Sequence, residues 1–239
     1  MSRVAIVAAL EREVRPLVKG WHTTDRQHSG RDFLFFERDE TVVVCGGIGA
    51  EAARRAAEAL IVLYQPSIVY SVGYAGALDP AIGIGQVLRP SRIIDVRDGS
   101  SVAVAGGEGI LVTVAGVASP AQKQTLRESF AAQAVDMEAS AVARAAQARG
   151  VEFAAIKAIS DALEFEFPST ERFVDADGRF LKARFAMFAA VRPRLWGRLI
   201  ELARNSRRAT RALCSELQGI IHKTAAPVAH AESTSIDAR

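Results

Sequence analysis

Continuous apolar runs alternate along this chain with segments whose polar and apolar positions follow a helical period. Apolar runs that end at charged or glycine-rich turns are typical of strands buried in a parallel sheet. The pattern predicts strands at residues 3–10, 33–37, 41–45, 67–72, 86–96 (one strand or two), 109–115 and 152–159. It predicts helices at residues 11–18, 50–64, 120–132, 138–146, 181–191 and 196–213, and a turn at 97–107. This alternation indicates an α/β fold.

Composition narrows the class of protein. The 239 residues are 49% hydrophobic and 24% charged, which suits one sizeable α/β domain. A formal net charge of +3 is too small to indicate nucleic-acid binding by itself. The first apolar stretch is too short for a signal peptide, and no run approaches the roughly 18 apolar residues of a membrane span. We therefore expect a cytoplasmic protein, with Cys45 and Cys214 reduced.

The C-terminal part of the chain has a different pattern. The segment 196–213 carries leucines on one face and arginines mostly on the other. Such a basic amphipathic helix can pack on its own domain, bind a partner or a second copy, or lie on a membrane surface. Residues 216–239 are rich in Ala, Ser, Thr and His towards their end, so we expect a domain at 1–215 and a flexible tail at 216–239.

Candidate chemistry lies where predicted strands meet helices. Glu13 and Glu138 stand near helix starts, and Asp161 follows a strand. Acids at these places can simply complement a helix dipole or cap a turn. They can equally serve a ligand, because α/β folds bind ligands at the carboxyl ends of strands. Spacing alone does not separate the two interpretations.

Two glycine-rich turns and the scattered histidines add little by themselves. The turn at 46–49 can present backbone N–H groups to an anion or simply allow tight packing, and the glycines at 73 and 76 would let the backbone approach a ligand closely. The first is not a dinucleotide-binding motif. No His/Cys cluster has metal-ligand spacing, so we expect neither a metal nor another cofactor.

Four short motifs stand at the ends of predicted strands and the starts of helices: AALEREV at 8–14, GYAGAL at 73–78, VDMEA at 135–139 and AIKAISD at 155–161. In this order they are similar to A-M-E-x-E-V, G-S/T-A-G-G-L, V-E/D-M-E-A and V-R-A-I-S-D. These are motifs of the nucleoside phosphorylase and nucleosidase superfamily, and the chain most resembles its methylthioadenosine/S-adenosylhomocysteine nucleosidases. The resemblance covers about 3–161 and 180–205. It implies one three-layer α/β/α domain with a mixed central sheet.

The resemblance also implies roles for individual residues. Glu13 matches the water-activating glutamate, Glu138 the acid that binds the ribose 2′ and 3′ hydroxyls, and Asp161 the aspartate that donates or shares a proton with purine N7. The remaining substrate contacts that it implies are Ala9, Gly49, Gly73, Tyr74, Ala75, Val117, Val135, Asp136, Met137 and Ser160.

The chain departs from the family at three places. Tyr74 replaces a small hydroxyl residue that helps phosphorylases to hold phosphate, which favours hydrolysis over phosphorolysis. Gly116 and Val117 stand where the nucleosidases carry an adenine-stacking aromatic residue, so base identity stays open. Residues 164–180 form an insertion whose phenylalanines are expected to fill the core, or else to line the pocket.

The sequence therefore predicts a purine nucleosidase that hydrolyses an adenine nucleoside such as methylthioadenosine or S-adenosylhomocysteine, as in methionine salvage. The family implies a homodimer, and no nucleic-acid partner is expected. Within the superfamily, the alternatives are a purine nucleoside phosphorylase that uses phosphate, or a relative of the hopanoid-associated phosphorylases, which act on an adenosyl lipid. The Arg-rich helix is similar to the tail of the latter and would allow weak membrane-surface contact. The alternative of another class is a non-catalytic nucleoside-binding module.

Overall fold

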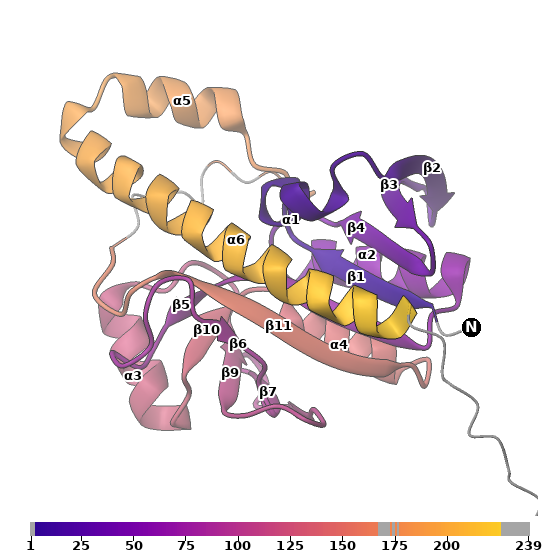
Figure 1. Cartoon of the computed structure of the whole chain (residues 1–239). Helices are drawn as coiled ribbons and strands as arrows, with labels where there is room; N and C mark the ends of the chain where they lie inside the picture. Colours follow the sequence, from indigo (N-terminus) through magenta and orange to yellow (C-terminus); the bar gives the residue numbers. More distant parts are fainter. Residues whose placement is uncertain (1–2, 167–172, 174, 176, 226–239) are drawn as a thin grey trace, which may run out of the picture.

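The computed structural model describes residues 3–166, 173, 175 and 177–225 and consists of a mixed sheet between two helical layers (Figure 1). In the centre of the sheet, β1 (Val4–Ala8) lies parallel to β4 (Thr41–Cys45) and to β5 (Ile68–Ala77). β5 also pairs in parallel with β11 (Glu152–Asp161). The predicted α/β/α architecture with a mixed sheet is confirmed.

Shorter strands extend this centre on both sides. Beyond β4 lies an antiparallel hairpin made of β2 (His22–His28) and β3 (Arg31–Arg38). On the other side, β10 (Ala134–Asp136) is antiparallel to the end of β5. The remaining strands are β9 (Ile110–Thr113), β7 (Arg92–Asp95), β8 (Ser101–Ala103) and β6 (Val87–Leu88). β9 and β7 continue the sheet in parallel, while β8 and β6 pair antiparallel with β7 and β11.

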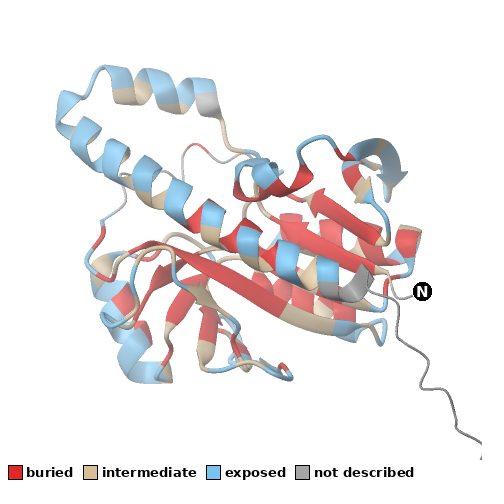
Figure 2. Cartoon of the chain, in the orientation of Figure 1, coloured by how far each residue is buried: buried red, intermediate tan, exposed pale blue. Residues whose placement is uncertain are grey.

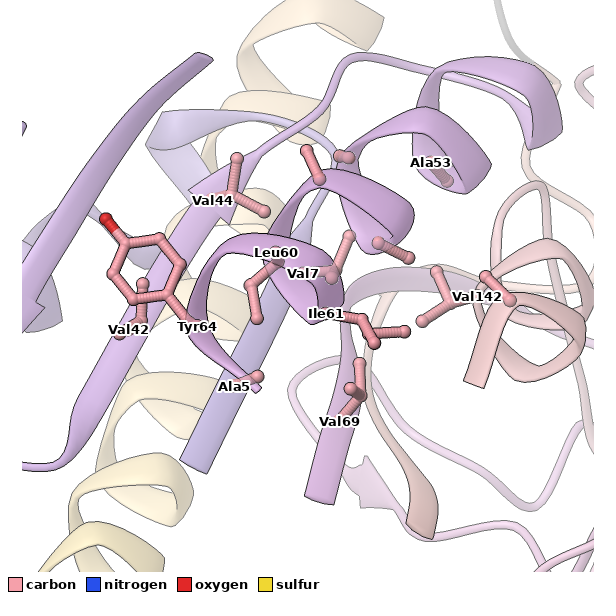
Figure 3. Close-up of a cluster of buried hydrophobic side chains, with 14 of the residues drawn as sticks. Ala5, Val7, Val42, Val44, Ala53, Leu60, Ile61, Tyr64, Val69 and Val142 are labelled. Carbon is pink, nitrogen blue, oxygen red and sulfur yellow. The ribbon is translucent and has the colours of Figure 1, made fainter. Parts of the chain in front are cut away.

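Helices bury both faces of the central strands. α2 (Ala50–Tyr64) and α4 (Ala139–Gln147) cover one face, and α1 (Glu11–Val18) and α6 (Trp196–Ala225) cover the other (Figure 1). The alternate residues of β1 show why its sequence is continuously apolar. Ala5 and Val7 enter the core under α2, which Figure 3 shows, whereas Ile6 enters the core under α1 and α6. Figure 2 shows the resulting buried sheet.

Two further helices complete the fold. α3 (Pro120–Phe130) begins as predicted, with Ser119 as its N-cap and Pro120 in the first turn. α5 (Lys182–Ala190) leads through a short 3₁₀ turn (Pro193–Leu195) into α6. α5 and the first turns of α6 project from the body of the molecule, and Figure 2 shows them largely exposed. None of the described helices has the length and apolarity needed to cross a membrane.

Four local predictions were wrong. β5 does not end at residue 72: it continues to Ala77, because its glycine-rich end stays paired with β11. β2 was missed because its sequence, HTTDRQH, is polar and mostly exposed at the sheet edge. β8 lies inside the predicted turn at 97–107. α6 does not end at 213 but continues to Ala225, and Leu217 is only 1% exposed, so a tail cannot begin at 216. Residues 226–239 lie outside the described residues.

Candidate active site

The carboxyl ends of β1, β5 and β11 border a cavity of about 390 Å³. All three predicted acids line it: Glu13 from α1, Glu138 from the start of α4, and Asp161 from the end of β11. Eight of the ten other predicted contacts also line it, namely Ala9, Tyr74, Ala75, Val117, Val135, Asp136, Met137 and Ser160. The two others do not line it: Gly49 contacts Glu138, and Gly73 lies next to Glu13.

Glu13 is held in place by the backbone that precedes its helix. Its Oε2 accepts hydrogen bonds from the N–H groups of Ala9 (3.1 Å) and Leu10 (3.2 Å), and the residue is 4% exposed. A Cβ at position 73 would lie 3.0 Å from the same oxygen, and Gly73 has a φ of 145°, so glycine there makes room for the carboxylate. Burial raises the pKa of Glu13, although the Leu10 N–H and Lys157 oppose this. A carboxylate with a raised pKa is suited to act as a general base near neutral pH.

Glu138 is the N-cap residue of α4, but its side chain does not accept a capping hydrogen bond from that helix. Its Oε1 accepts the N–H of Gly49 at 2.9 Å, so Gly49 contacts this acid although it does not line the cavity. Its Oε2 accepts the N–H of Met137 at 3.3 Å. Burial, and then the charge of Asp136, raise the pKa of Glu138 to about 7. The group is thus poised between its protonated and ionised forms.

Asp136 and Lys157 form a buried ion pair beneath these acids. Asp136 Oδ2 lies 2.9 Å from Lys157 Nζ and 2.9 Å from the N–H of Ala139, while Oδ1 accepts the Thr113 hydroxyl at 2.7 Å. Lys157 Nζ also donates to Ser71 Oγ at 3.1 Å. Burial works against the charged lysine, but Asp136 and Glu138 outweigh it and raise the pKa of Lys157. The carboxylate of Asp136 is therefore bonded to other groups of the protein, and Lys157 compensates the negative charge of Asp136 and Glu138.

Asp161, which also lines the cavity, pairs with a second buried lysine. Lys123 Nζ from α3 lies 2.5 Å from Asp161 Oδ2 and 2.6 Å from the carbonyl oxygen of Ala162. Asp161 Oδ1 accepts the Ser160 hydroxyl at 2.7 Å. A shift in the β11–β5 register between Ile159 and Asp161 brings the adjacent Ser160 and Asp161 both to the cavity. This ammonium–carboxylate pair was not predicted from the sequence.

One wall of the cavity is apolar and comes from the C-terminal part of the chain. Phe180, Phe185 and Leu202 line it together with Tyr74. The Tyr74 hydroxyl lies 2.7 Å from Thr210 Oγ1, so the ring that replaces the small family residue is anchored on α6. Phe180 thus lines the pocket instead of filling the core, whereas Phe165 and Phe173 are buried. Phe167, in the same predicted insertion, lies outside the described residues.

One part of the cavity lining has small side chains. Val114, Gly116, Val117 and Ala118 line it where the family resemblance implied an aromatic residue. Among the described residues, no group of three or more His, Cys, Asp or Glu side chains is arranged to hold a metal ion.

Glu138 is expected to make stability depend on pH. Its pKa in the folded protein, about 7, exceeds the ordinary 4.5, so the folded state binds this proton more tightly than the unfolded chain does. The resulting stabilisation is complete below pH 4.5 and is lost as the pH rises through about 7. Glu138→Gln cannot ionise and should not lose this stabilisation. The difference in unfolding free energy between the variant and the unchanged protein should therefore shift in favour of the variant by on the order of 2–3 kcal/mol when the pH is raised from about 5 to about 8.

Urea unfolding at the two pH values measures this gain. Glu128→Gln, on the exposed part of α3, is the matched control and should follow the unchanged protein at both. If the unfolding free energy of Glu138→Gln had the same pH dependence as that of the unchanged protein, ionisation of Glu138 would not destabilise the fold.

Comparison with known proteins agrees with this architecture. The family model of the Phosphorylase superfamily matches residues 3–109 and 101–191. The chain therefore belongs to this superfamily and is an enzyme of its N-glycosidic bond-cleaving class, as the sequence motifs predicted.

Individual relatives are nucleosidases. A 5′-methylthioadenosine/S-adenosylhomocysteine nucleosidase of Shewanella sp. is 25% identical over 221 residues, which cover 77% of this chain and 94% of that protein. The corresponding enzyme of Marinomonas sp. is 30% identical over 98 residues, and the match spans 39% of this chain and 42% of that protein.

Solved structures show the same fold. The Helicobacter pylori 5′-methylthioadenosine/S-adenosylhomocysteine nucleosidase with butyl-thio-DADMe-Immucillin-A has a TM-score of 0.69 at 17% identity, over 93% of this chain and 99% of that one. The Arabidopsis thaliana 5′-methylthioadenosine nucleosidase has a TM-score of 0.71 at 19% identity, over 95% of this chain and 98% of that one. A futalosine hydrolase of H. pylori shares this fold too. Its TM-score is 0.69 at 17% identity, over 93% of this chain and 98% of that one.

Proposed function

We propose that the protein is a nucleosidase that hydrolyses the N-glycosidic bond of an adenine nucleoside such as methylthioadenosine or S-adenosylhomocysteine. The observation that carries the proposal is the convergence of Glu13, Glu138 and Asp161, from distant parts of the chain, on one cavity. The names of the relatives support the same chemistry. We also propose a homodimer in the cytoplasm, as the family resemblance implies.

Glu13 would act on the attacking water. As the water oxygen bonds to C1′ of the sugar, a proton passes from the water to the Glu13 carboxylate, and the C1′–N9 bond breaks with its electrons going to the base. The two backbone N–H groups hold Oε2 in place, and the other oxygen, Oε1, is available for the water. The products are the free sugar and the free purine.

Glu138 would bind the sugar. An ionised carboxylate accepts hydrogen bonds from two neighbouring hydroxyls, which matches the 2′ and 3′ positions of ribose. Its negative charge would also stabilise the positive charge that develops on the sugar ring as the bond breaks. Met137 and Val135 line the same part of the cavity and would pack against the sugar.

The purine would leave at the Asp161 end. The departing base gains negative charge, and a proton delivered to N7 makes it a better leaving group. The small residues Val114, Gly116 and Val117 leave room for a flat ring there. In this proposal the base would lie between β11 and the loop that follows β9.

Phosphorolysis is the alternative reaction of the same site. The anchored Tyr74 ring occupies the position of a phosphate-binding residue, which favours water as the nucleophile. Arg12, which also lines the cavity, is the group that would hold phosphate if the reaction were a phosphorolysis.

A second candidate substrate follows from the apolar wall. Phe180, Phe185 and Leu202 would suit an adenine nucleoside with a large apolar 5′ substituent, such as the adenosyl lipid of the hopanoid-associated alternative. Four apolar side chains on the projecting helices beyond this wall are half or more exposed: Met187, Val191, Trp196 and Ile200. With the neighbouring arginines they could hold the protein weakly at a lipid surface.

One substrate panel tests these proposals. Release of free base is measured for methylthioadenosine, S-adenosylhomocysteine, adenosine, inosine and 5′-alkylthioadenosines of increasing chain length, with and without phosphate. We expect adenine release without phosphate, and a further rise with chain length if the lipid alternative holds. Asp161→Asn should lower adenine release, and Asp175→Asn, on a described residue outside the cavity, is the control. If no nucleoside released its base, the non-catalytic binding module would replace this proposal.

A further inference from the structure

The ion pair of Lys123 and Asp161 is a second charged centre in the cavity, besides the group that Glu13, Asp136 and Glu138 form with Lys157. Both residues line the cavity, and they are 1% and 4% exposed. Their charged atoms lie 2.5 Å apart. A lysine buried at this depth needs a partner, and Asp161 provides it.

The pair is fixed by its surroundings. A Cβ at position 76 would lie 2.7 Å from Asp161 Oδ2 and 3.1 Å from Lys123 Cε, so the chain packs a glycine against both groups. Ser160 orients the other oxygen of Asp161, and the carbonyl of Ala162 orients Lys123. Both charged groups therefore present fixed directions to a ligand.

The hydrogen-bonding capacity of the pair leaves room for such a ligand. An ammonium has three N–H donors, and the described part of the chain supplies Lys123 with two acceptors, Asp161 Oδ2 and the Ala162 carbonyl. Each oxygen of Asp161 can accept a second bond besides the one that it has. The pair therefore offers one donor and one acceptor side by side.

This arrangement matches the edge of adenine. Along that edge, adenine presents the acceptor N7 and the donor 6-amino group, whereas a 6-oxopurine presents two acceptors. A lysine that donates to N7 beside a carboxylate that accepts from the amino group would fit adenine and disfavour hypoxanthine.

We propose that Lys123 is a further catalytic residue, which donates its proton to N7 of the leaving adenine while Asp161 binds the 6-amino group. The inference rests on the proposed function. As the C1′–N9 bond breaks, its electrons pass into the purine ring, N7 takes a proton from the ammonium, and neutral adenine leaves. Water supplies the new bond to C1′ and gives its proton to Glu13. When the products depart, Glu13 releases this proton to solvent and the neutral amine of Lys123 takes one from solvent, so both groups return to their starting forms.

The test compares the unchanged protein with Lys123→Met, which keeps the length of the side chain but carries no donor. Adenine release is measured with methylthioadenosine. Binding of adenine and of 7-deazaadenine, which lacks the N7 acceptor, is measured by calorimetry. Gln124→Met, at the adjacent exposed position of α3, is the matched control.

We expect Lys123→Met to lower adenine release on the order of 10²-fold or more. It should also lose the preference for adenine over 7-deazaadenine, which the unchanged protein and the control should show. If the variant folds poorly because Asp161 is left unpaired, Lys123→Met with Asp161→Asn removes both charges and should lose the same preference.

A variant that released adenine normally would overturn the proposal. So would a variant whose release fell while its preference for adenine over 7-deazaadenine stayed intact, since that would make Lys123 structural only. A failure of the proposed function looks different, because the unchanged protein would then release no base at all.

Discussion

Glu13→Gln is expected to lower the rate of base release on the order of 10²–10⁴-fold while leaving the fold intact. The amide oxygen of glutamine can still accept the N–H groups of Ala9 and Leu10, so the side chain keeps its position. What the variant lacks is a group that takes the proton from water. The measurement is kcat for adenine release under saturating substrate, with binding of a nucleoside followed separately.

Glu11→Gln is the matched control, because Glu11 is an exposed acid one helical turn from Arg15 on the same helix. It should leave kcat unchanged. Glu13→Gln should still bind the nucleoside, since its contribution is to the reaction and not to the sugar or base. A Glu13→Gln protein with normal kcat would remove Glu13 from the mechanism and leave Glu138 as the next candidate base.

The predictable part of the fold is its buried centre. The strand at 41–45 was predicted to the residue because its apolar run lies between a charged turn and a glycine-rich one, and the helix at 11–18 because its acids stand just past the end of a strand. Ser119 and Pro120 marked the start of α3 through the chemistry of helix capping. Elements at the edge carry no such signal: β2 is polar, and its pairing with β3 is not visible in its own sequence.

The end of β5 shows a different limit of sequence analysis. The strand was predicted to end before Gly73, but in the structure Gly73 and Gly76 remain in β5 because β11 and β10 pair with it on either side. The glycines are needed there for space, since Cβ atoms would approach the carboxylates of Glu13 and Asp161. Only the tertiary structure distinguishes a glycine that ends a strand from a glycine that makes room for a side chain within the strand.

The site was predicted through its acids but not through its lysines. The motifs contained Glu13, Glu138 and Asp161, and the structure brings them to one cavity. Lysines are seldom fully buried, so a sequence offers little reason to place them inside a protein. The signal for Lys123 was its spacing of three residues from Leu126, which is also buried on α3.

Removal of the other buried lysine is expected to have the largest effect on stability. Lys157→Met would leave Asp136 without the ammonium 2.9 Å from its Oδ2, and Glu138 and Glu13 without the cation that opposes their own raised pKa values. Unpaired buried charge is costly, and the loss of one member of such a pair should lower the unfolding free energy by about 3–5 kcal/mol. Urea unfolding at neutral pH measures this loss, and Lys157→Arg, which keeps the charge, should lose less.

The double variant Lys157→Met with Asp136→Asn separates charge from packing. It removes both charges, and the asparagine oxygen can still accept the N–H of Ala139, so it should recover much of the stability that Lys157→Met loses. If the two single substitutions simply added, the lysine would contribute through packing alone. A recovery would show that the Lys157 cation is what allows Glu13, Asp136 and Glu138 to share the buried site. Without this cation, Asp136 would hold an uncompensated charge next to Glu138, the carboxylate proposed to bind ribose.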